Sequence, residues 1–185
     1  MPKGLKTTSS PIQISGSQTA VTDHVATNFI SKRVDLQLNP LDNEVFVVTG
    51  VKIDFMNPLA LPDSSVAGTK VMTQRCSLST GAQTVYAGIE SPSVLGASLI
   101  DAQADVQIGA VNYFTAIEQN AMDAPPASMD YIGIIATNDF FINFENSTLY
   151  ATNQTLGVSI RVYGYRAQAD ASTYAALVQS ELLSQ

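Results

Sequence analysis

The sequence predicts an all-β fold, in which two antiparallel sheets pack as a sandwich or single jelly roll of about eight strands, followed by a short C-terminal helix. Apolar and polar residues alternate in many segments, turn residues separate these segments, and helical periodicity is confined to short stretches. No internal repeat is present, which disfavours propellers and solenoids. An immunoglobulin-like sandwich lacks support because the sequence has no tryptophan and one cysteine. The expected strands are 19–30, 33–39, 45–56, 69–79, 83–89, 107–117, 131–145 and 156–166.

We expect three parts along the chain: an N-terminal arm over 1–17, a β-sandwich domain over 18–169 and an amphipathic helix over 170–185. The arm is polar and interrupted by glycine and proline, so it is expected to be flexible and to become ordered only against something else. Asp170 or Ser172 can cap the helix at its N-terminus. The apolar stripe of the helix contains Tyr174, Leu177, Val178 and Leu182.

The first half of the sandwich is expected to begin with a hairpin. Segment 33–39 alternates, and the turn residues of 39–43 join it to the apolar segment 45–56. The second strand is expected to begin deep in the core and to end near solvent. One face of that strand is predicted to hold Val45, Val47, Val51, Ile53 and Phe55.

The middle of the chain holds one ambiguous segment, 93–106. Its larger apolar residues recur at helical spacing and Ser93 can cap a helix, so we expect a short helix there. Segments 69–79, 83–89 and 107–117 are expected to be strands.

The clearest β signal is Tyr131–Arg166, which we interpret as an antiparallel strand pair with a bulge or bend at Asn138-Asp139. In its second strand Val158, Ile160 and Val162 are expected to face the core. The opposite face is either a subunit contact or a solvent-exposed ladder, and both interpretations are kept. That face carries Arg161, Tyr163 and Tyr165.

The connector of this strand pair is expected to be an exposed loop. It contains Asn146 and Asn153, each within an N-x-[ST] pattern. Such patterns are common, and polar turn chemistry explains both without glycosylation.

Charged residues make up only 14% of the chain, against about a quarter in ordinary soluble domains. The surface is therefore neutral, either because it is rich in hydroxyl and amide groups or because much of it faces other protein subunits. The net charge of −7 argues against binding of nucleic acid by the whole domain. Only Lys3 and Lys6 make the N-terminal segment basic, and both are candidate contacts. No transmembrane segment is expected.

No pattern in the sequence indicates catalysis, so we do not expect an enzyme, a cofactor or a metal site. A nucleophile elbow, a phosphate-binding loop, a zinc cluster and a calcium-binding loop are all missing from the sequence. The single histidine, His24, has no neighbouring ligand cluster and is more simply structural or solvated. The single cysteine, Cys76, is expected to be a small buried apolar residue.

This layout resembles that of small viral capsid proteins of the single jelly-roll kind. The residues that carry the resemblance are a polar N-terminal arm, about eight strands, the long terminal strand pair Tyr131–Arg166 and a short C-terminal tail. The resemblance implies a structural virion protein, foremost a major capsid protein, that self-assembles into a shell in the host cytoplasm. Its partners would be copies of itself and other virion proteins. Arms that bind genomes are usually strongly basic, and this one is not, so little direct nucleic-acid binding is expected.

The alternative function is a binding module on a β-sandwich, such as a carbohydrate-binding domain or a virion fibre or tail attachment domain. Aromatic side chains stack on sugar rings, and the lack of tryptophan counts against this alternative. The candidate aromatic residues are Tyr86, Tyr113, Tyr150, Tyr163 and Tyr165.

Overall fold

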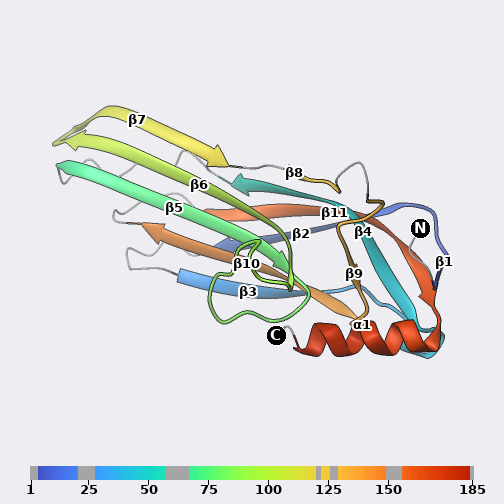
Figure 1. The fold of residues 1–185 in the computed structure, drawn as a ribbon. Helices are drawn as coiled ribbons and strands as arrows, with labels where there is room; N and C mark the ends of the chain where they lie inside the picture. The colour runs from blue at the N-terminus through green and yellow to red at the C-terminus, as the bar shows by residue number, and fades with distance from the viewer. Residues whose placement is uncertain are drawn as a thin grey trace.

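The computed structural model describes residues 4–20, 28–56, 67–119, 122–125, 129–148 and 156–183. In this part of the chain two antiparallel sheets face each other and one helix follows the last strand, which confirms the predicted fold class (Figure 1). Sheet one has the order β1-β11-β4-β8, and in addition β2 pairs with β11 and β9 pairs with β4. Its strands are β1 (Leu5–Thr7), β2 (Ile12–Ala20), β4 (Glu44–Met56), β8 (Met122–Asp123), β9 (Gly133–Ile135) and β11 (Leu156–Ala169).

Sheet two has the order β3-β10-β5-β6-β7. A 3-10 turn (Pro40–Asp42) lies between β3 and β4, and helix α1 (Ala171–Leu183) follows β11. The strands of sheet two are β3 (Asn28–Asp35), β5 (Gly68–Ser79), β6 (Val94–Gln107), β7 (Ala110–Gln119) and β10 (Asp139–Thr148).

Strand pairing is nested, as a jelly roll requires. The outermost pairs are β1 and β2 with β11, followed inward along the chain by β3 with β10, β4 with β9, and β5 with β6. The chain thus behaves as one long hairpin that is rolled so that alternate pairs lie in opposite sheets. Strand β7 extends this plan, because it adds to sheet two beside β6 after a short turn.

The nesting shows that both predicted hairpins are wrong. Strands β3 and β4 lie in different sheets, and so do β10 and β11, which contain most of the Tyr131–Arg166 stretch. Alternation in sequence identifies a strand and its buried face, but it does not identify the neighbouring strand. In this fold the chain crosses to the other sheet at these connections, so the partners lie far apart in sequence.

The core lies between the sheets. Val158, Ile160 and Val162 face it from β11, as predicted, and Cys76 is fully buried in it. The largest fully buried side chains are Phe46, Phe140, Phe144, Met72 and Leu78. Burying each side chain of this size contributes about 1.5–3 kcal/mol, so the core is the main source of stability.

A register shift in sheet one divides β4 into two halves, in which even-numbered residues and then odd-numbered residues face the core. Tyr163 pairs with Gly50 and Gly164 pairs with Val48, so the register skips Thr49. The prediction that Val45 and Val47 share one face with Val51, Ile53 and Phe55 is therefore wrong, because one extra residue reverses the alternation. Phe46 and Val48 join Val51, Ile53 and Phe55 in the core, while Val45 and Val47 belong to a second cluster.

The second cluster lies on the outer face of sheet one, under α1. Its buried members are Val45, Val47, Ala136, Ala167 and Ala169. Tyr174, Leu177 and Val178 of the helix pack against them, which agrees with three of the four residues of the predicted stripe. The fourth, Leu182, is exposed. Asp170 caps the helix, because its side chain accepts a hydrogen bond from Thr173 N at 2.8 Å.

The segment 93–106 is a strand and not the predicted helix. It forms most of β6, in which small buried residues at every second position, such as Ala102 and Ala104, alternate with polar ones such as Gln103. The larger apolar residues recur at helical spacing, but small buried residues alternate with polar exposed ones, and this alternation matches a strand. Segment 83–89, predicted as a strand, lies in an irregular loop between β5 and β6.

Other boundaries differ less. The predicted strand 131–145 is split into β9 and β10 by a bend at residues 137–138, next to the predicted bend. The predicted strand 19–30 covers the end of β2 and the start of β3, and 21–27 lies outside the described residues, as does His24. The described residues of the expected arm, 4–17, include β1 and much of β2, which both pair with β11.

Candidate interaction surfaces

The predicted contact residues of β11 have different surroundings, because α1 packs near Tyr165 but leaves Arg161 exposed. Arg161 is exposed on the outer face of sheet one, and Tyr163 is half-buried on the same face. Tyr165 also lies on this face but packs in the second cluster under the helix, where burial raises its pKa. Arg161 lines a shallow polar depression of about 360 Å³ together with Ser15, Gly16, Ser17, Asp54, Ser159 and Ile160.

Within the described part of the chain, the structure does not bring the remaining predicted site residues together with Arg161, Tyr163 and Tyr165. Lys6 is exposed on β1, and Lys3 lies outside the described residues. Asn146 does not lie in an exposed loop: it is within β10 and only 8% exposed. Its Oδ1 has no hydrogen-bond partner among the described residues. Asn153 falls outside the described part of the chain.

The tyrosines proposed for sugar stacking are distributed over separate elements. Tyr86 lies in the loop after β5, where the Arg75 guanidinium stands 5.7 Å from the centre of its ring. Burial is also the main cause that raises the pKa of Tyr86. Tyr113 is on β7, Tyr163 is on β11, and Tyr150 lies outside the described residues. The structure therefore shows no single aromatic platform among the described residues.

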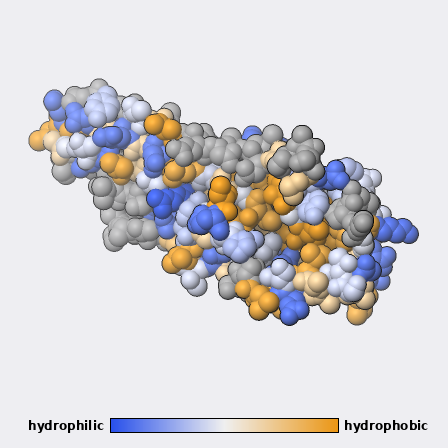
Figure 2. Space-filling model, viewed as in Figure 1, coloured by the Kyte–Doolittle hydropathy of each residue, from blue (hydrophilic) through white to orange (hydrophobic). Residues whose placement is uncertain are grey.

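A second depression, which we call the apolar depression, has a volume of about 230 Å³. Two of its side chains are well exposed, Ile89 at 77% and Met129 at 48%. Hydrophobic side chains gather on the face shown in Figure 2, over the region of β4 and β9 in Figure 1. The depression is lined by Ile89, Val94, Leu95, Ala124, Pro125, Met129, Tyr131 and Ile132.

Hydrogen bonds hold the loop that presents Ile89. Ser93 accepts hydrogen bonds at its carbonyl from Thr80 N at 2.9 Å and at its hydroxyl from Gln83 Nε2 at 2.9 Å. The residue before Ile89 is also bonded to the two residues after it, because Gly88 N donates to Glu90 Oε1 at 2.9 Å and Ser91 N donates to Gly88 O at 3.1 Å. The backbone hydrogen bonds lower the pKa of Glu90. The exposed Ile89 is thus presented by a loop that internal hydrogen bonds hold in place.

Helix α1 is fixed by a buried carboxylate that the sequence analysis missed. Glu181 accepts hydrogen bonds from Ala136 N at 2.8 Å and Thr137 N at 2.9 Å, between β9 and β10. Burial raises the pKa of Glu181, while these two hydrogen bonds act in the opposite direction. In sequence Glu181 reads as a solvent-facing residue near the end of a helix, so no local signal reveals its role.

Past Glu181 the helix exposes apolar side chains again. Leu182 and Leu183 are exposed, and an apolar hollow of about 580 Å³ lies along Tyr174, Ala175, Val178, Gln179, Leu182 and Leu183.

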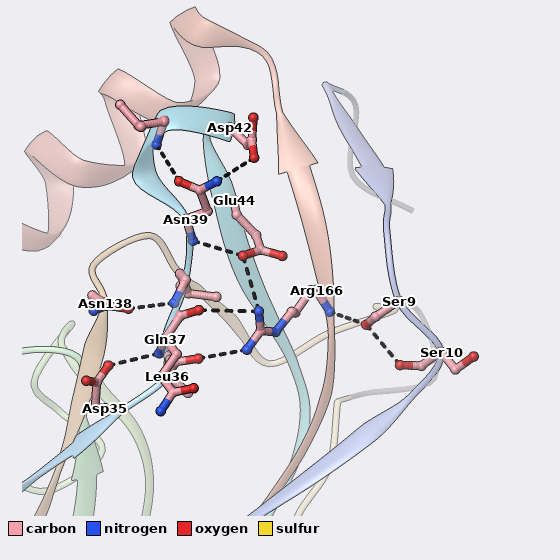
Figure 3. A network of polar contacts seen from close by, with 12 residues as sticks. Ser9, Ser10, Asp35, Leu36, Gln37, Asn39, Asp42, Glu44, Asn138 and Arg166 are labelled. Atoms are coloured by element: carbon pink, nitrogen blue, oxygen red, sulfur yellow. Dashed lines mark hydrogen bonds and ion pairs between the residues drawn. The ribbon is translucent and has the colours of Figure 1, made fainter.

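Arg166 organises a polar network at the corner between the two sheets (Figure 3). Its guanidinium donates to Leu36 O at 3.0 Å, to Gln37 O at 3.3 Å and to Glu44 Oε2 at 3.3 Å. Asn39 N also donates to Glu44 Oε2, at 2.9 Å. These contacts join β11 to the turn between β3 and β4, so the network has a structural role.

The described residues contain no group of three or more His, Cys, Asp or Glu side chains that could hold a metal ion. No helix within the described ranges is long and apolar enough to cross a membrane. The Cys76 thiol is buried, and burial raises its pKa far above the usual value, so it is poorly suited to act as a nucleophile.

No family model matches the chain, and no curated protein matches it in sequence. Solved structures to which the chain shows weak similarity include proteins of viruses. The structure of VP1 from Merkel cell polyomavirus, an unassembled pentamer, is 9% identical and has a TM-score of 0.37 over 88% of this chain and 96% of that chain. VP1 of chimpanzee polyomavirus is 8% identical, with a TM-score of 0.38 over 92% and 97%. Desmodium yellow mottle tymovirus gives 9% identity and a TM-score of 0.27 over 91% and 92%.

Proposed function

We propose that this chain is a structural subunit that assembles with copies of itself into the shell of a virus. The apolar depression carries the proposal. Its exposed side chains Ile89 and Met129 stand beside half-buried apolar walls, and a hydrogen-bonded loop holds one of them in place. A group of exposed apolar side chains on a surface held in place by hydrogen bonds is typical of a protein–protein contact, whereas single exposed apolar residues need no explanation.

The charge content of the chain supports this proposal. Only 14% of the residues are charged, so large parts of the surface can be buried against another subunit without removing charges from water. The polar outer face near Arg161 and Tyr163, and Lys6 on β1, are proposed as further contacts. The partners are copies of this chain and other virion proteins. The net charge of −7 supports the proposal that this chain makes little direct contact with nucleic acid. The proposal assigns the chain no catalytic role.

The test is a charge placed in the apolar depression. Because Ile89 is 77% exposed, Ile89→Asp is expected to leave the melting temperature nearly unchanged, while it weakens self-association about tenfold or more. Association is measured by sedimentation velocity over a range of concentration and salt, and particles are examined by electron microscopy. The matched control is Leu41→Asp, since Leu41 is 91% exposed on the 3-10 turn and does not line the depression.

We expect wild type and Leu41→Asp to assemble alike and Ile89→Asp to assemble less. A wild-type chain that stays monomeric at every concentration and salt condition would contradict the proposal. Equal loss of assembly in the two variants would contradict the role of the depression.

A further inference from the structure

Strand β7 is an open edge of sheet two. Among the described residues it pairs only with β6, and in Figure 1 it lies at the margin of its sheet. An edge strand presents backbone N–H and C=O groups that can pair with another chain, and natural proteins usually block such edges with lysine, proline or bulges. The ten residues of β7 contain neither lysine nor proline, and Glu118 is the only charged one. The register against β6 skips Asn112, so β7 has an irregularity near its start, while 113–117 pairs regularly.

One face of β7 is apolar as well as exposed. Tyr113 is 49% exposed and Ile117 is 59% exposed, and they flank Thr115 on the same face. The neighbouring residues on β6 are polar, because Asp105, Gln103 and Asp101 are opposite Tyr113, Thr115 and Ile117. The apolar side chains of Tyr113 and Ile117 therefore have polar residues directly opposite them on β6, and a strand added at the open edge can supply apolar partners.

We propose that β7 pairs antiparallel with β7 of a second copy of this chain, with Thr115 on the two-fold axis. The two sheets then form one continuous sheet across the dimer. In this register Tyr113 of each copy lies opposite Ile117 of the other, so an aromatic–β-branched pair forms twice. The proposal rests on the proposed function, since it names a surface by which copies meet, and it uses a surface separate from the apolar depression.

Charge placement is compatible with a second copy as the occupant. The chain carries a net charge of −7, but in this register the two Glu118 positions stand six residue steps apart, or roughly 20 Å. The two β6 strands, with Asp101 and Asp105, are three strand spacings apart, or roughly 14 Å. Both distances exceed the screening length of about 8 Å at physiological salt, so the acidic groups repel one another weakly.

The first experiment is a cross-link on the axis. Thr115→Cys places two introduced thiols opposite each other, at a Cα separation of about 4.5–5.5 Å that suits a disulfide. The native thiol of Cys76 is buried and does not interfere. The control, Gln103→Cys, introduces an exposed thiol on the same face but on β6, about 14 Å from its counterpart. Non-reducing electrophoresis after mild oxidation with glutathione is expected to show a covalent dimer for Thr115→Cys only. Equal dimer yields, or none for Thr115→Cys, would overturn the proposal.

The second experiment uses charge at the same position. Thr115→Lys and Thr115→Asp alone each place like charges together and are expected to raise the dimer dissociation constant about tenfold or more. An equimolar mixture is expected to associate at least as tightly as wild type. A mixture no tighter than the separate variants would overturn the register.

Repeating the cross-link in the Ile89→Asp background separates this inference from the proposed function. A cross-linked dimer in that background supports β7 pairing even when larger assembly is lost. Shells that form from wild type while Thr115→Cys gives no cross-link would overturn β7 pairing and leave the proposed function standing.

Discussion

The two margins of the sandwich are built differently. At one margin β2 and β3, from different sheets, are joined: Lys32 Nζ donates to Ser17 O at 2.7 Å. Gly16 allows this close approach, because a Cβ at that position would lie 2.7 Å from Ile142 Cδ1 of the opposite sheet. At the other margin β7 carries no basic residue and pairs only with β6 among the described residues. The first margin is closed within the chain, and the second is available to another chain.

This difference separates folding from association. Residues at the closed margin are expected to change the stability of the monomer, and residues at the open margin are expected to change the affinity between copies. The following predictions test that separation, beginning with the largest expected effect.

Asn143→Ala is expected to cost the most stability. The fully buried Asn143 side chain accepts a hydrogen bond from Ser31 Oγ at 2.8 Å and donates one to Ser79 Oγ at 2.8 Å, which joins β3 of the closed margin to β10 and β5. Loss of both bonds and the cavity left behind are expected to lower the free energy of unfolding by about 2–4 kcal/mol. Urea denaturation measures the change.

Thr115→Ala, at the exposed centre of β7, is the matched comparison and is expected to change the same free energy by no more than about 0.5 kcal/mol. If the two substitutions had similar effects on unfolding, the distinction between the margins would fail.

On the outer face of sheet one, the buried Glu181 holds helix α1 to the segment between β9 and β10. Glu181→Gln keeps the size of the side chain but can accept only one of the two backbone hydrogen bonds and turns an amide donor toward the other. Its expected cost is about 1–3 kcal/mol, measured by urea denaturation at neutral pH. Glu44→Gln is a less suitable control because Glu44 bonds Arg166, so Gln179→Glu, on the exposed side of α1, is used instead.

The raised pKa of Glu181 adds a dependence on pH. The folded state binds the proton more tightly than the unfolded state, so this group contributes most below its ordinary pKa of about 4.5. Its contribution falls as the pH rises through the folded-state pKa. The difference in unfolding free energy between wild type and Glu181→Gln is therefore expected to grow on acidification from neutral pH toward pH 4. A difference that shrinks on acidification would contradict this sign.

The fold class, several strands and the C-terminal helix could be predicted because each depends on local periodicity. Strands β4, β5 and β11 contain long apolar or alternating segments, and Asp170 stands directly before the helix it caps. Pairing could not be predicted in this way, because β2 and β11 are brought together only when the whole chain is rolled. The face of Val45 and Val47 was missed for a related reason, since a single skipped residue reverses the alternation.

The candidate site was less predictable than the fold. Ile89 was expected inside a strand, yet it is presented on a loop, whereas Arg161 was correctly expected on the face opposite Val162. The openness of β7 depends on what the rest of the chain leaves uncovered, and a single strand's sequence does not contain that information. The strand's sequence does lack lysine, but that absence becomes informative only once the fold places β7 at an edge.

Among the substitutions that remove a polar contact, the smallest effect on stability is expected for Lys32→Met, which removes the cation from the closed margin. Lys32 is exposed, so the loss of its hydrogen bond to Ser17 O is expected to cost no more than about 1 kcal/mol. The effect on association is expected to be larger than the effect on stability. The substitution leaves the Ser17 carbonyl of β2 without its lysine partner, and β2 has no charged residue of its own to block pairing with another chain. Sedimentation velocity is expected to show oligomers of Lys32→Met that resist Thr115→Lys, since they form at the other margin. Lys70→Met, on β5, serves as the control for loss of positive charge. If Lys32→Met remained as soluble and as weakly associated as Lys70→Met, the lysine would not be what distinguishes the closed margin from the open one.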